Sequence, residues 1–286
     1  MNFQKYHGTG NDFVVMEALE GRPAWLDSKA VQRICDRHFG VGADGVLLVE
    51  RGKAAPFFMR VLNADGSEAE MCGNGIRCVA RHIREVMAVP DEPLRIETLA
   101  GVKSCHIRTS PSGQVLAVAV SLGPPILERW RIPIAGPGDN IAVSVSALGR
   151  HFVGHGVSMG NPHFVIFEGL TNDEAWRYGA MLSTSPMFPM QANISFAEQV
   201  GPQHFRLVVY ERGCGVTLAC GTGAGATAVA AVLTGRAAPD EPITMDLPGG
   251  TLILTIPKDL SDVMLEGPAE RVFMGTLCEA LTGRSP

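Results

Sequence analysis

The sequence has few aromatic residues, no long apolar run and no excess of basic residues. Only 6% of its 286 residues are aromatic, and its formal net charge at pH 7 is −5. No apolar stretch approaches the roughly 20 residues that span a bilayer, and no cluster of Lys and Arg favours nucleic acid or an acidic membrane as a partner. The segment from Met1 to Asn11 lacks the basic start and apolar run of a secretory signal. We therefore expect a cytoplasmic protein whose partner is a small molecule, with no nucleic acid and no membrane.

The cysteines do not have the spacing of a structural zinc site. There are seven of them, an odd number without a secretory context, so most are expected to be buried and reduced. Cys72 and Cys78 form one pair, and Cys214 and Cys220 form another at the same spacing, with five residues between partners. Zinc-binding pairs usually have two to four intervening residues. A four-cysteine zinc site is thus an alternative that we do not favour, and no metal is expected.

Glycine is abundant, and a glycine motif occurs twice. The chain has 33 glycines, with 46% hydrophobic and 19% charged residues, which is typical of a turn-rich globular protein. A cysteine stands directly before Gly-x-Gly at Cys72-Gly73-Asn74-Gly75 and again at Cys220-Gly221-Thr222-Gly223. A segment with helical spacing follows each motif, so each cysteine is expected at a helix N-terminus. The unpaired N–H groups there stabilise an anion by about 0.3–2 kcal/mol and lower the pKa of a thiol.

The helices that follow the two motifs differ in pattern. From Gly73 to about Met87 the apolar residues recur at three and four positions, and Arg77, Arg81 and Arg84 are expected on another face. From Gly221 to about Thr234 the segment is rich in alanine and apolar nearly all round, so strands should enclose it. An earlier helix is expected to begin near Asp27 or Ser28, to place His38 on its inner face and to end at Gly40.

Both halves of the chain repeat one order of parts: helix, strands, polar loop, cysteine motif, buried helix and further strands. We therefore predict an α+β protein of two pseudo-symmetric domains, each a mostly antiparallel sheet or barrel around a central helix. The expected domains are residues 1–122 and 123–268, with a strand in about 269–286 returning to the first. The two helix N-termini are expected to meet at a shared cleft.

Two thiols facing one carbon atom form an acid and base pair. Amides of Gly73, Asn74, Gly221 and Thr222 are placed to hold a substrate carboxylate, and they stabilise it further when the α-proton leaves. If Cys72 or Cys220 removes the proton and the other thiol supplies one to the opposite face, the configuration inverts. The thiols should share one proton as a coupled pair. This chemistry requires no cofactor, and the sequence has no motif for pyridoxal phosphate.

The chain resembles the diaminopimelate epimerase family in a series of motifs that cover nearly its whole length. They are His7–Phe13, Gly42–Gly45, Asn63–Glu68, Cys72–Cys78, Met159–His163, Asn193, Glu211–Gly213 and Ala219–Gly223. The resemblance implies interconversion of LL- and meso-diaminopimelate for lysine and peptidoglycan synthesis, often by a homodimer. It implies that Cys72 and Cys220 are the two bases.

The resemblance also implies the residues that bind substrate. Besides the four amides, they are Asn11, Asp44, Asn63, Asn161, Asn193, Glu211 and Arg212. Arg212 can fork onto a carboxylate and Glu211 can pair with an ammonium group. His163 is expected to be a nearby orienting residue. Each asparagine taken alone, however, is more typical of a turn-capping residue than of a substrate-binding one.

Two positions depart from the family's pattern and leave other functions open. Val216 stands where Glu is common, and Asp44 stands where some members have Gln. Both bear on the distal end of the substrate, so a racemase of another amino acid is the first alternative. A noncatalytic amino-acid-binding protein is the second, although it would have no reason to keep two thiols at matched helix starts.

Overall fold

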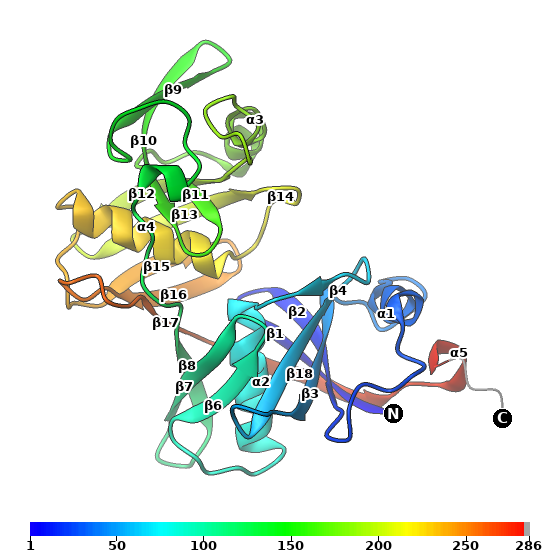
Figure 1. Cartoon of the computed structure of the whole chain (residues 1–286). Coiled ribbons are helices and arrows are strands. Elements are labelled where there is room, and N and C mark those ends of the chain that lie inside the picture. Colours follow the sequence, from blue (N-terminus) through cyan, green and yellow to red (C-terminus); the bar gives the residue numbers. More distant parts are fainter. Residues whose placement is uncertain (283–286) are drawn as a thin grey trace. The chain divides into compact units, whose positions relative to one another are not determined.

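The computed structural model describes residues 1–282, which fall into two compact units (Figure 1). Unit 1 comprises Met1–Val120 and the segment from Gly267 onward, and unit 2 comprises Ser121–Glu266. Residues 283–286 of the expected returning segment lie outside the described residues. Among residues 1–282, no helix combines the length and apolar character needed to cross a membrane.

Unit 1 places helix α2 against a mostly antiparallel sheet. Its elements are β1 (Asn2–Gly8), β2 (Asn11–Glu17), α1 (Ser28–Cys35), β3 (Gly45–Arg51), β4 (Phe57–Asn63), β5 (Glu68–Ala69), α2 (Gly73–Glu85), β6 (Leu94–Thr98), β7 (Gly101–Thr109), β8 (Val115–Ser121), β18 (Glu270–Thr276) and α5 (Glu279–Thr282). Strand β18 pairs with β1, and β1 pairs with β2, both antiparallel. Helix α2 packs against β1, β2 and β7. The strands of unit 1 thus form the support on which the start of α2 is held.

Unit 2 is built on the same plan around helix α4. Its elements are η1 (Arg129–Arg131), β9 (Val143–Ala147), β10 (Arg150–Ser158), β11 (Pro162–Ile166), α3 (Asn172–Ser183), β12 (Asn193–Gly201), β13 (His204–Glu211), β14 (Gly215–Val216), α4 (Gly221–Leu233), β15 (Ile243–Leu247), β16 (Gly250–Thr255) and β17 (Met264–Gly267). Helix α4 packs against β10, β11, β12 and β16. Ten of its thirteen residues are buried, which confirms that the alanine-rich helix is enclosed by strands.

The strand pairings repeat from one unit to the other. In unit 1, β2 runs parallel to β3, β3 antiparallel to β4, and β4 parallel to β6. In unit 2, β11 runs parallel to β12, β12 antiparallel to β13, and β13 parallel to β15. The short strands β5 and β14, each just before a cysteine motif, pair antiparallel with β4 and β13. The predicted α+β fold with two related halves is therefore confirmed.

The helix α1 is shorter than the sequence pattern predicted. It is capped by Asp27, as expected, but it ends at Cys35 rather than at Gly40. Asp36 leaves the helical conformation, and its carboxylate accepts hydrogen bonds from the backbone N–H groups of His38 and Phe39 at 2.7 and 2.8 Å. The prediction that His38 lies on the inner face of a helix was wrong, because this Asp turn competes with the next helical turn.

Candidate active site

Cys72 is the N-cap residue of α2, as predicted. Its backbone is extended, with φ −138° and ψ 116°, and its Sγ accepts a hydrogen bond from the Gly75 N–H at 3.4 Å. The same sulfur lies 3.8 Å from Oδ1 of Asn11, which stands at the start of β2. The first N–H groups of a helix have no acceptor within the helix, so this end of α2 favours a negative charge on sulfur or on a bound carboxylate.

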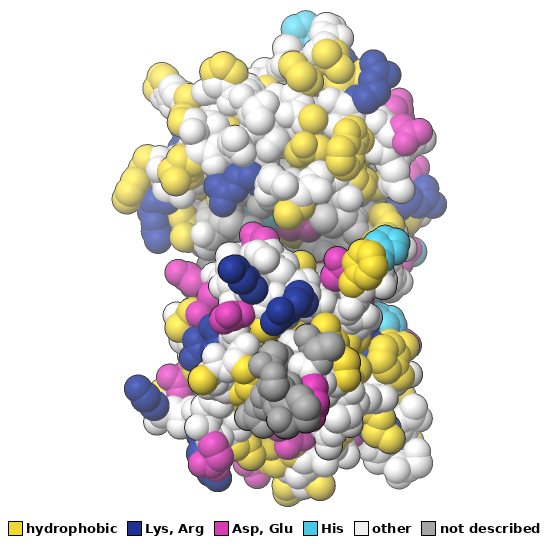
Figure 2. All heavy atoms as spheres, turned by 90° about the vertical axis from the view of Figure 1, so that its right-hand side faces the viewer, with side chains coloured by type: hydrophobic (Ala, Val, Ile, Leu, Met, Phe, Trp, Pro, Cys, Tyr) yellow, Lys and Arg dark blue, Asp and Glu magenta, His cyan; other side chains and the backbone are white. Residues whose placement is uncertain are grey.

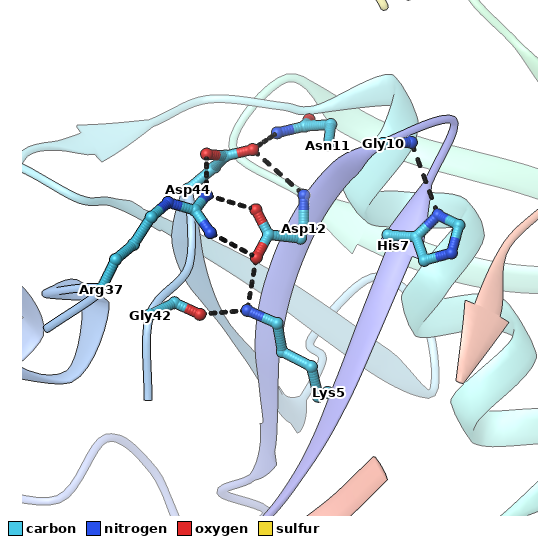
Figure 3. Close-up of polar contacts among 8 residues, drawn as sticks. All are labelled: Lys5, His7, Gly10, Asn11, Asp12, Arg37, Gly42 and Asp44. Carbon is cyan, nitrogen blue, oxygen red and sulfur yellow. Dashed lines mark hydrogen bonds and ion pairs between the residues drawn. The ribbon is translucent and has the colours of Figure 1, made fainter. Parts of the chain in front are cut away.

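Asn11 is held in place by a network of charged residues (Figure 3). Its Nδ2 donates to Oδ2 of Asp44 at 2.7 Å, and Arg37 bridges the carboxylates of Asp44 and Asp12 at 2.7 and 2.6 Å. Lys5 contacts Asp12 from the other side. Burial alone would raise the pKa of Asp12, but the hydrogen bonds and charges of Arg37 and Lys5 outweigh it and lower this pKa to about 2. Asp12 therefore stays charged at neutral pH, and the network fixes which way the Asn11 amide points.

Asn63 and Asp44 lie beside each other at the ends of neighbouring strands. Asn63 ends β4 directly opposite Gly45 of β3, and the Ala64 N–H donates to the Asp44 carbonyl at 3.1 Å. The Asn63 amide donates to Oγ of Ser67 at 3.0 Å and so caps its own turn. Asn11 contacts Asp44, Asn74 and the Cys72 sulfur. The Asn63 side chain binds Ser67 instead, while the backbone of its turn contacts Asp44.

Arg77 differs most from the sequence prediction. It was expected on the same polar face of the helix as Arg81 and Arg84, but its side chain is fully buried, at 0% exposure. Its guanidinium donates to the carbonyls of Gly73 and Pro268 at 3.1 and 3.2 Å. Burial is tolerated because these carbonyls, together with side-chain oxygens, satisfy its donors.

Cys220 is the N-cap residue of α4 and occupies the position in unit 2 that Cys72 occupies in unit 1. It is buried, with 5% exposure, and its Sγ lies 3.6 Å from Oγ1 of Thr222. Burial, followed by the negative charge of Glu211, raises the pKa of this thiol well above its ordinary value. At neutral pH Cys220 therefore holds its proton. The prediction that the helix start lowers the pKa of this thiol was wrong, because burial outweighs the helix N-terminus.

A polar chain leads from Cys220 to a buried histidine. Asn161 donates from Nδ2 to Oγ1 of Thr222 at 3.3 Å, and its Oδ1 lies 3.1 Å from Nε2 of His163. Burial, followed by the positive charge of Arg212, lowers the pKa of His163 to about 3, so the ring is neutral. An amide oxygen only accepts, so the neutral ring carries its proton on Nε2 in this arrangement. The orienting role of His163 stays a prediction, and Asn161 is the neighbour that its ring contacts.

Asn193, Glu211 and Arg212 meet at the end of β13. The Arg212 N–H donates to Oδ1 of Asn193 at 2.8 Å, and the exposed Arg212 guanidinium donates to the Met190 carbonyl at 2.8 Å. Glu211 accepts from the Thr217 hydroxyl at 2.5 Å. A carboxylate and a guanidinium thus lie at the end of the strand that leads into the second cysteine motif.

Three residues of these networks were not identified from the sequence: Lys5, Arg37 and Thr217. Arg37 follows the early end of α1, and Lys5 reaches Asp12 from the neighbouring strand β1. Their partners are set by strand pairing and by an unexpected turn rather than by any local motif. The sequence offers one indication for Thr217: it lies six residues after Glu211, and the two residues flank the tight turn before Cys220.

The Glu211 carboxylate is expected to suppress the reactivity of Cys220. Since its charge raises the pKa of the thiol, Glu211→Gln should lower that pKa, and alkylation of Cys220 at pH 8 should become about tenfold faster. The rate of iodoacetamide labelling between pH 6 and 10, read by mass spectrometry of the Cys220 peptide, measures this. Glu198→Gln, which removes a carboxylate paired with Arg206 elsewhere in unit 2, is the control. An unchanged labelling profile in Glu211→Gln would contradict the assigned cause.

On the face of the molecule in Figure 2, basic and acidic side chains are interspersed rather than segregated. Among residues 1–282, no group of three or more His, Cys, Asp and Glu side chains is placed to hold a metal ion.

Solved structures with this fold include racemases and epimerases. The chain superposes on a probable proline racemase from Agrobacterium radiobacter with a TM-score of 0.71 at 15% identity, covering 97% of this chain and 92% of that one. It superposes on a hydroxyproline epimerase from Agrobacterium vitis with a TM-score of 0.67 at 16% identity, covering 96% and 91%. A PhzF-family phenazine biosynthesis protein from Bacillus anthracis gives 0.69 at 16%, covering 97% and 99%. At these identities the likeness establishes the fold alone.

Sequence comparison is more specific. The family model for diaminopimelate epimerase matches residues 3–127 and 156–272. Diaminopimelate epimerase from Desulforudis audaxviator is 46% identical over 278 residues, which are 96% of this chain and 98% of that protein. The enzyme of the same name from Desulfitobacterium hafniense is 42% identical over 98% of this chain and 99% of its own length. The chain belongs to the diaminopimelate epimerase family and is an isomerase of the racemase and epimerase class.

Proposed function

We propose that this protein interconverts LL- and meso-diaminopimelate by proton transfer at the α-carbon between two cysteines. The observation that carries the proposal is that Cys72 and Cys220 are N-cap residues of the central helices α2 and α4, which occupy equivalent positions in two units of the same topology. One thiolate removes the α-proton, and the electron pair moves into the substrate carboxylate. The other thiol then gives its proton to the opposite face of the carbon, which inverts the configuration.

The two cysteines have different resting states in this scheme. Cys220 keeps its proton because burial and Glu211 raise the pKa of its thiol. We assign the thiolate of the pair to Cys72, which is only half-buried and accepts a backbone N–H at the start of α2. The two groups share one proton, and a turnover exchanges which sulfur carries it.

In this proposal the substrate is held by backbone amides and by polar and charged side chains. The amides of Gly73, Asn74, Gly221 and Thr222 bind the reacting carboxylate and stabilise the charge that develops there. Arg212 binds a carboxylate of the substrate, and Glu211 binds an ammonium group. The remaining polar contacts are assigned to Asn11, Asp44, Asn63, Asn161 and Asn193, of which Asp44 acts through Asn11, since its carboxylate is bound to Arg37 and Asn11.

We also propose a metabolic role and a cellular compartment for the enzyme. Its product supplies lysine and peptidoglycan synthesis, and the cytoplasm suits it because both catalytic thiols must stay reduced. We place the domain boundary at residues 122–123 and the end of the second domain near 268.

A racemase of another amino acid is the second candidate function, since Val216 packs against the unit 2 core where many relatives are expected to have Glu.

A substrate panel in heavy water tests the function. The purified protein is incubated with LL-diaminopimelate, meso-diaminopimelate, L-proline, L-glutamate and L-lysine, and α-deuteration and inversion are followed by NMR and chiral chromatography. Both processes are expected with the two diaminopimelates and neither with the other amino acids. Inversion of a different amino acid would favour the second candidate. Binding without any deuterium exchange would indicate a noncatalytic binding protein.

We also propose that the protein is a homodimer formed through β18. Three consecutive apolar residues of this strand, Val272, Phe273 and Met274, are exposed, with Met274 at 74%. Exposed apolar side chains on a paired strand of unit 1 fit an identical apolar strand of a second copy.

Met274→Glu is expected to convert the dimer to a monomer, because two carboxylates would be buried at a self-complementary contact. Light scattering coupled to size-exclusion chromatography measures the mass, and thermal unfolding checks that the variant is folded. Lys103→Glu, a charge change on β7 of the same unit, is the control. A wild-type protein that elutes as a monomer at micromolar concentration would contradict the proposed dimer.

A further inference from the structure

Arg77 carries a buried positive charge whose hydrogen-bond partners are all uncharged. Its side chain is 0% exposed, and its four acceptors are the carbonyls of Gly73 and Pro268, Oδ1 of Asn74 and Oγ1 of Thr9. A guanidinium does not lose its proton, and a buried charge without a counter-charge costs several kcal/mol. The charge of Arg77 therefore calls for an anion nearby.

Two cysteines of helix α2 are the ionisable groups that act on Arg77: Cys72 at its N-terminus and Cys78 next to Arg77 in the sequence. Burial lowers the pKa of Arg77, and the charges of Cys78 and Cys72 act in the opposite direction. Burial also raises the pKa of the Cys78 thiol to about 12, so Cys78 is neutral throughout the physiological range. Cys72 is the other thiol that acts on Arg77, and hydrogen-bonded contacts through Asn74 and Asn11 connect the two residues.

Arg77 also determines how the polar groups beside Cys72 are oriented. Its Nη2 donates to Oδ1 of Asn74 at 2.9 Å, and a guanidinium has only donors, so the Asn74 oxygen has to face it. The Asn74 Nδ2 then points to Oδ1 of Asn11 at 3.2 Å, and that oxygen lies 3.8 Å from the Cys72 sulfur. At the other end Asp44 accepts from Asn11 Nδ2 at 2.7 Å.

We propose that Arg77 is a positioning residue for Cys72, which stabilises its thiolate by charge and, through Asn74, turns the Asn11 oxygen toward its thiol. The proposal rests on the proposed function, in which Cys72 must act in turn as a base and as an acid. As a thiolate, Cys72 is compensated by Arg77. As a thiol, it has an acceptor in Asn11 that aims its proton. Arg77 itself does not touch the substrate.

Three variants separate charge, orientation and general damage to the helix. Arg77→Gln removes the charge, and Arg77→Lys keeps the charge but loses the fork that binds Asn74 and Gly73 together. Arg81→Gln is the matched control, because Arg81 lies one turn further along α2 and contacts Glu85 and the Ala269 carbonyl. Thermal unfolding shows whether each variant is folded.

The main readout is the pH dependence of Cys72 alkylation by iodoacetamide, resolved from Cys78 and Cys220 by peptide mass spectrometry. In Arg77→Gln the pH of half-maximal labelling is expected to rise by about one unit, as for the loss of one nearby opposite charge. It should stay at the wild-type value in Arg77→Lys and Arg81→Gln. An unshifted profile in Arg77→Gln overturns the proposal. If that variant does not fold, a shift of a full unit in Arg77→Lys overturns it, because the charge is still present.

Turnover is the second readout. The value of kcat is expected to fall about a hundredfold in Arg77→Gln and about tenfold in Arg77→Lys, with KM changing less than threefold, since Arg77 does not touch substrate. Wild-type kcat in Arg77→Lys would overturn the orienting role. Alkylation needs no substrate, so a wild-type protein inactive on diaminopimelate would overturn the proposed function while the labelling profiles still decide the effect of Arg77 on Cys72.

Discussion

Replacing either Cys72 or Cys220 with alanine is expected to reduce epimerisation of diaminopimelate by at least about a thousandfold. Each thiol serves one face of the α-carbon, so loss of either one leaves no group to complete the inversion. The effect should be nearly the same for the two single variants and for the double variant, because residues that act as a unit are not additive. The fold should survive, since both cysteines lie at helix starts where alanine is tolerated at modest cost.

The measurement is the rate of inversion by chiral chromatography together with α-deuteration in heavy water. With one thiol left, a variant can still remove the proton from one epimer and return a deuteron on the same side. Residual exchange is therefore expected with one epimer for Cys72→Ala and with the other for Cys220→Ala. Cys278→Ala, which changes an exposed cysteine of unit 1, should keep full activity. Wild-type inversion rates in either single variant would exclude the two-base scheme.

Replacing Arg212 with methionine is expected to raise KM for diaminopimelate about a hundredfold, the equivalent of losing one charge-assisted, two-pronged hydrogen bond of roughly 2–3 kcal/mol. The Arg212 N–H is bound to Asn193, and its exposed guanidinium is steadied by the Met190 carbonyl. The Arg212 guanidinium is therefore held at the end of β13, where its N–H groups can donate hydrogen bonds to a substrate carboxylate. If it contacts the substrate away from the reacting carbon, kcat should fall much less than KM rises.

Steady-state kinetics on Arg212→Met and Arg212→Lys test this assignment. Lysine keeps the charge but cannot form the fork, so its KM should lie between those of the wild type and Arg212→Met. Arg206→Met is the matched control, since Arg206 lies in β13, the strand that precedes Arg212, and pairs with Glu198 on the surface. A KM within threefold of the wild type in Arg212→Met would remove Arg212 from the substrate-binding set.

The glycine motifs were sufficient to locate the two candidate bases. A cysteine before Gly-x-Gly and a helical pattern predicted an N-cap position, and both cysteines occupy it. The nearly uniform apolar character of the second helix predicted that strands enclose it, and it is buried as predicted. Features of this kind are local, because they depend on backbone conformation and on the side chains of one short segment.

The burial of Arg77 could not be predicted from the spacing of residues in its helix. Helical spacing assigned it to a polar face, but its guanidinium reaches the Pro268 carbonyl, 191 residues away in the sequence. Likewise, Arg37 binds Asp12 and Asp44 only because α1 ends early at Asp36. The charge on these residues can be read from the sequence, whereas the partners that satisfy it cannot.

The sequence by itself determined the chemistry of this protein: two thiols at helix starts, the polar loops around them and the repeat that makes two related halves. The tertiary structure decided which charges are buried and which way each amide points. The physical reason is that a helix start is fixed by a few neighbouring residues, while a buried guanidinium or a carboxylate pair is stable only when strands distant in the chain bring its partners within hydrogen-bonding distance.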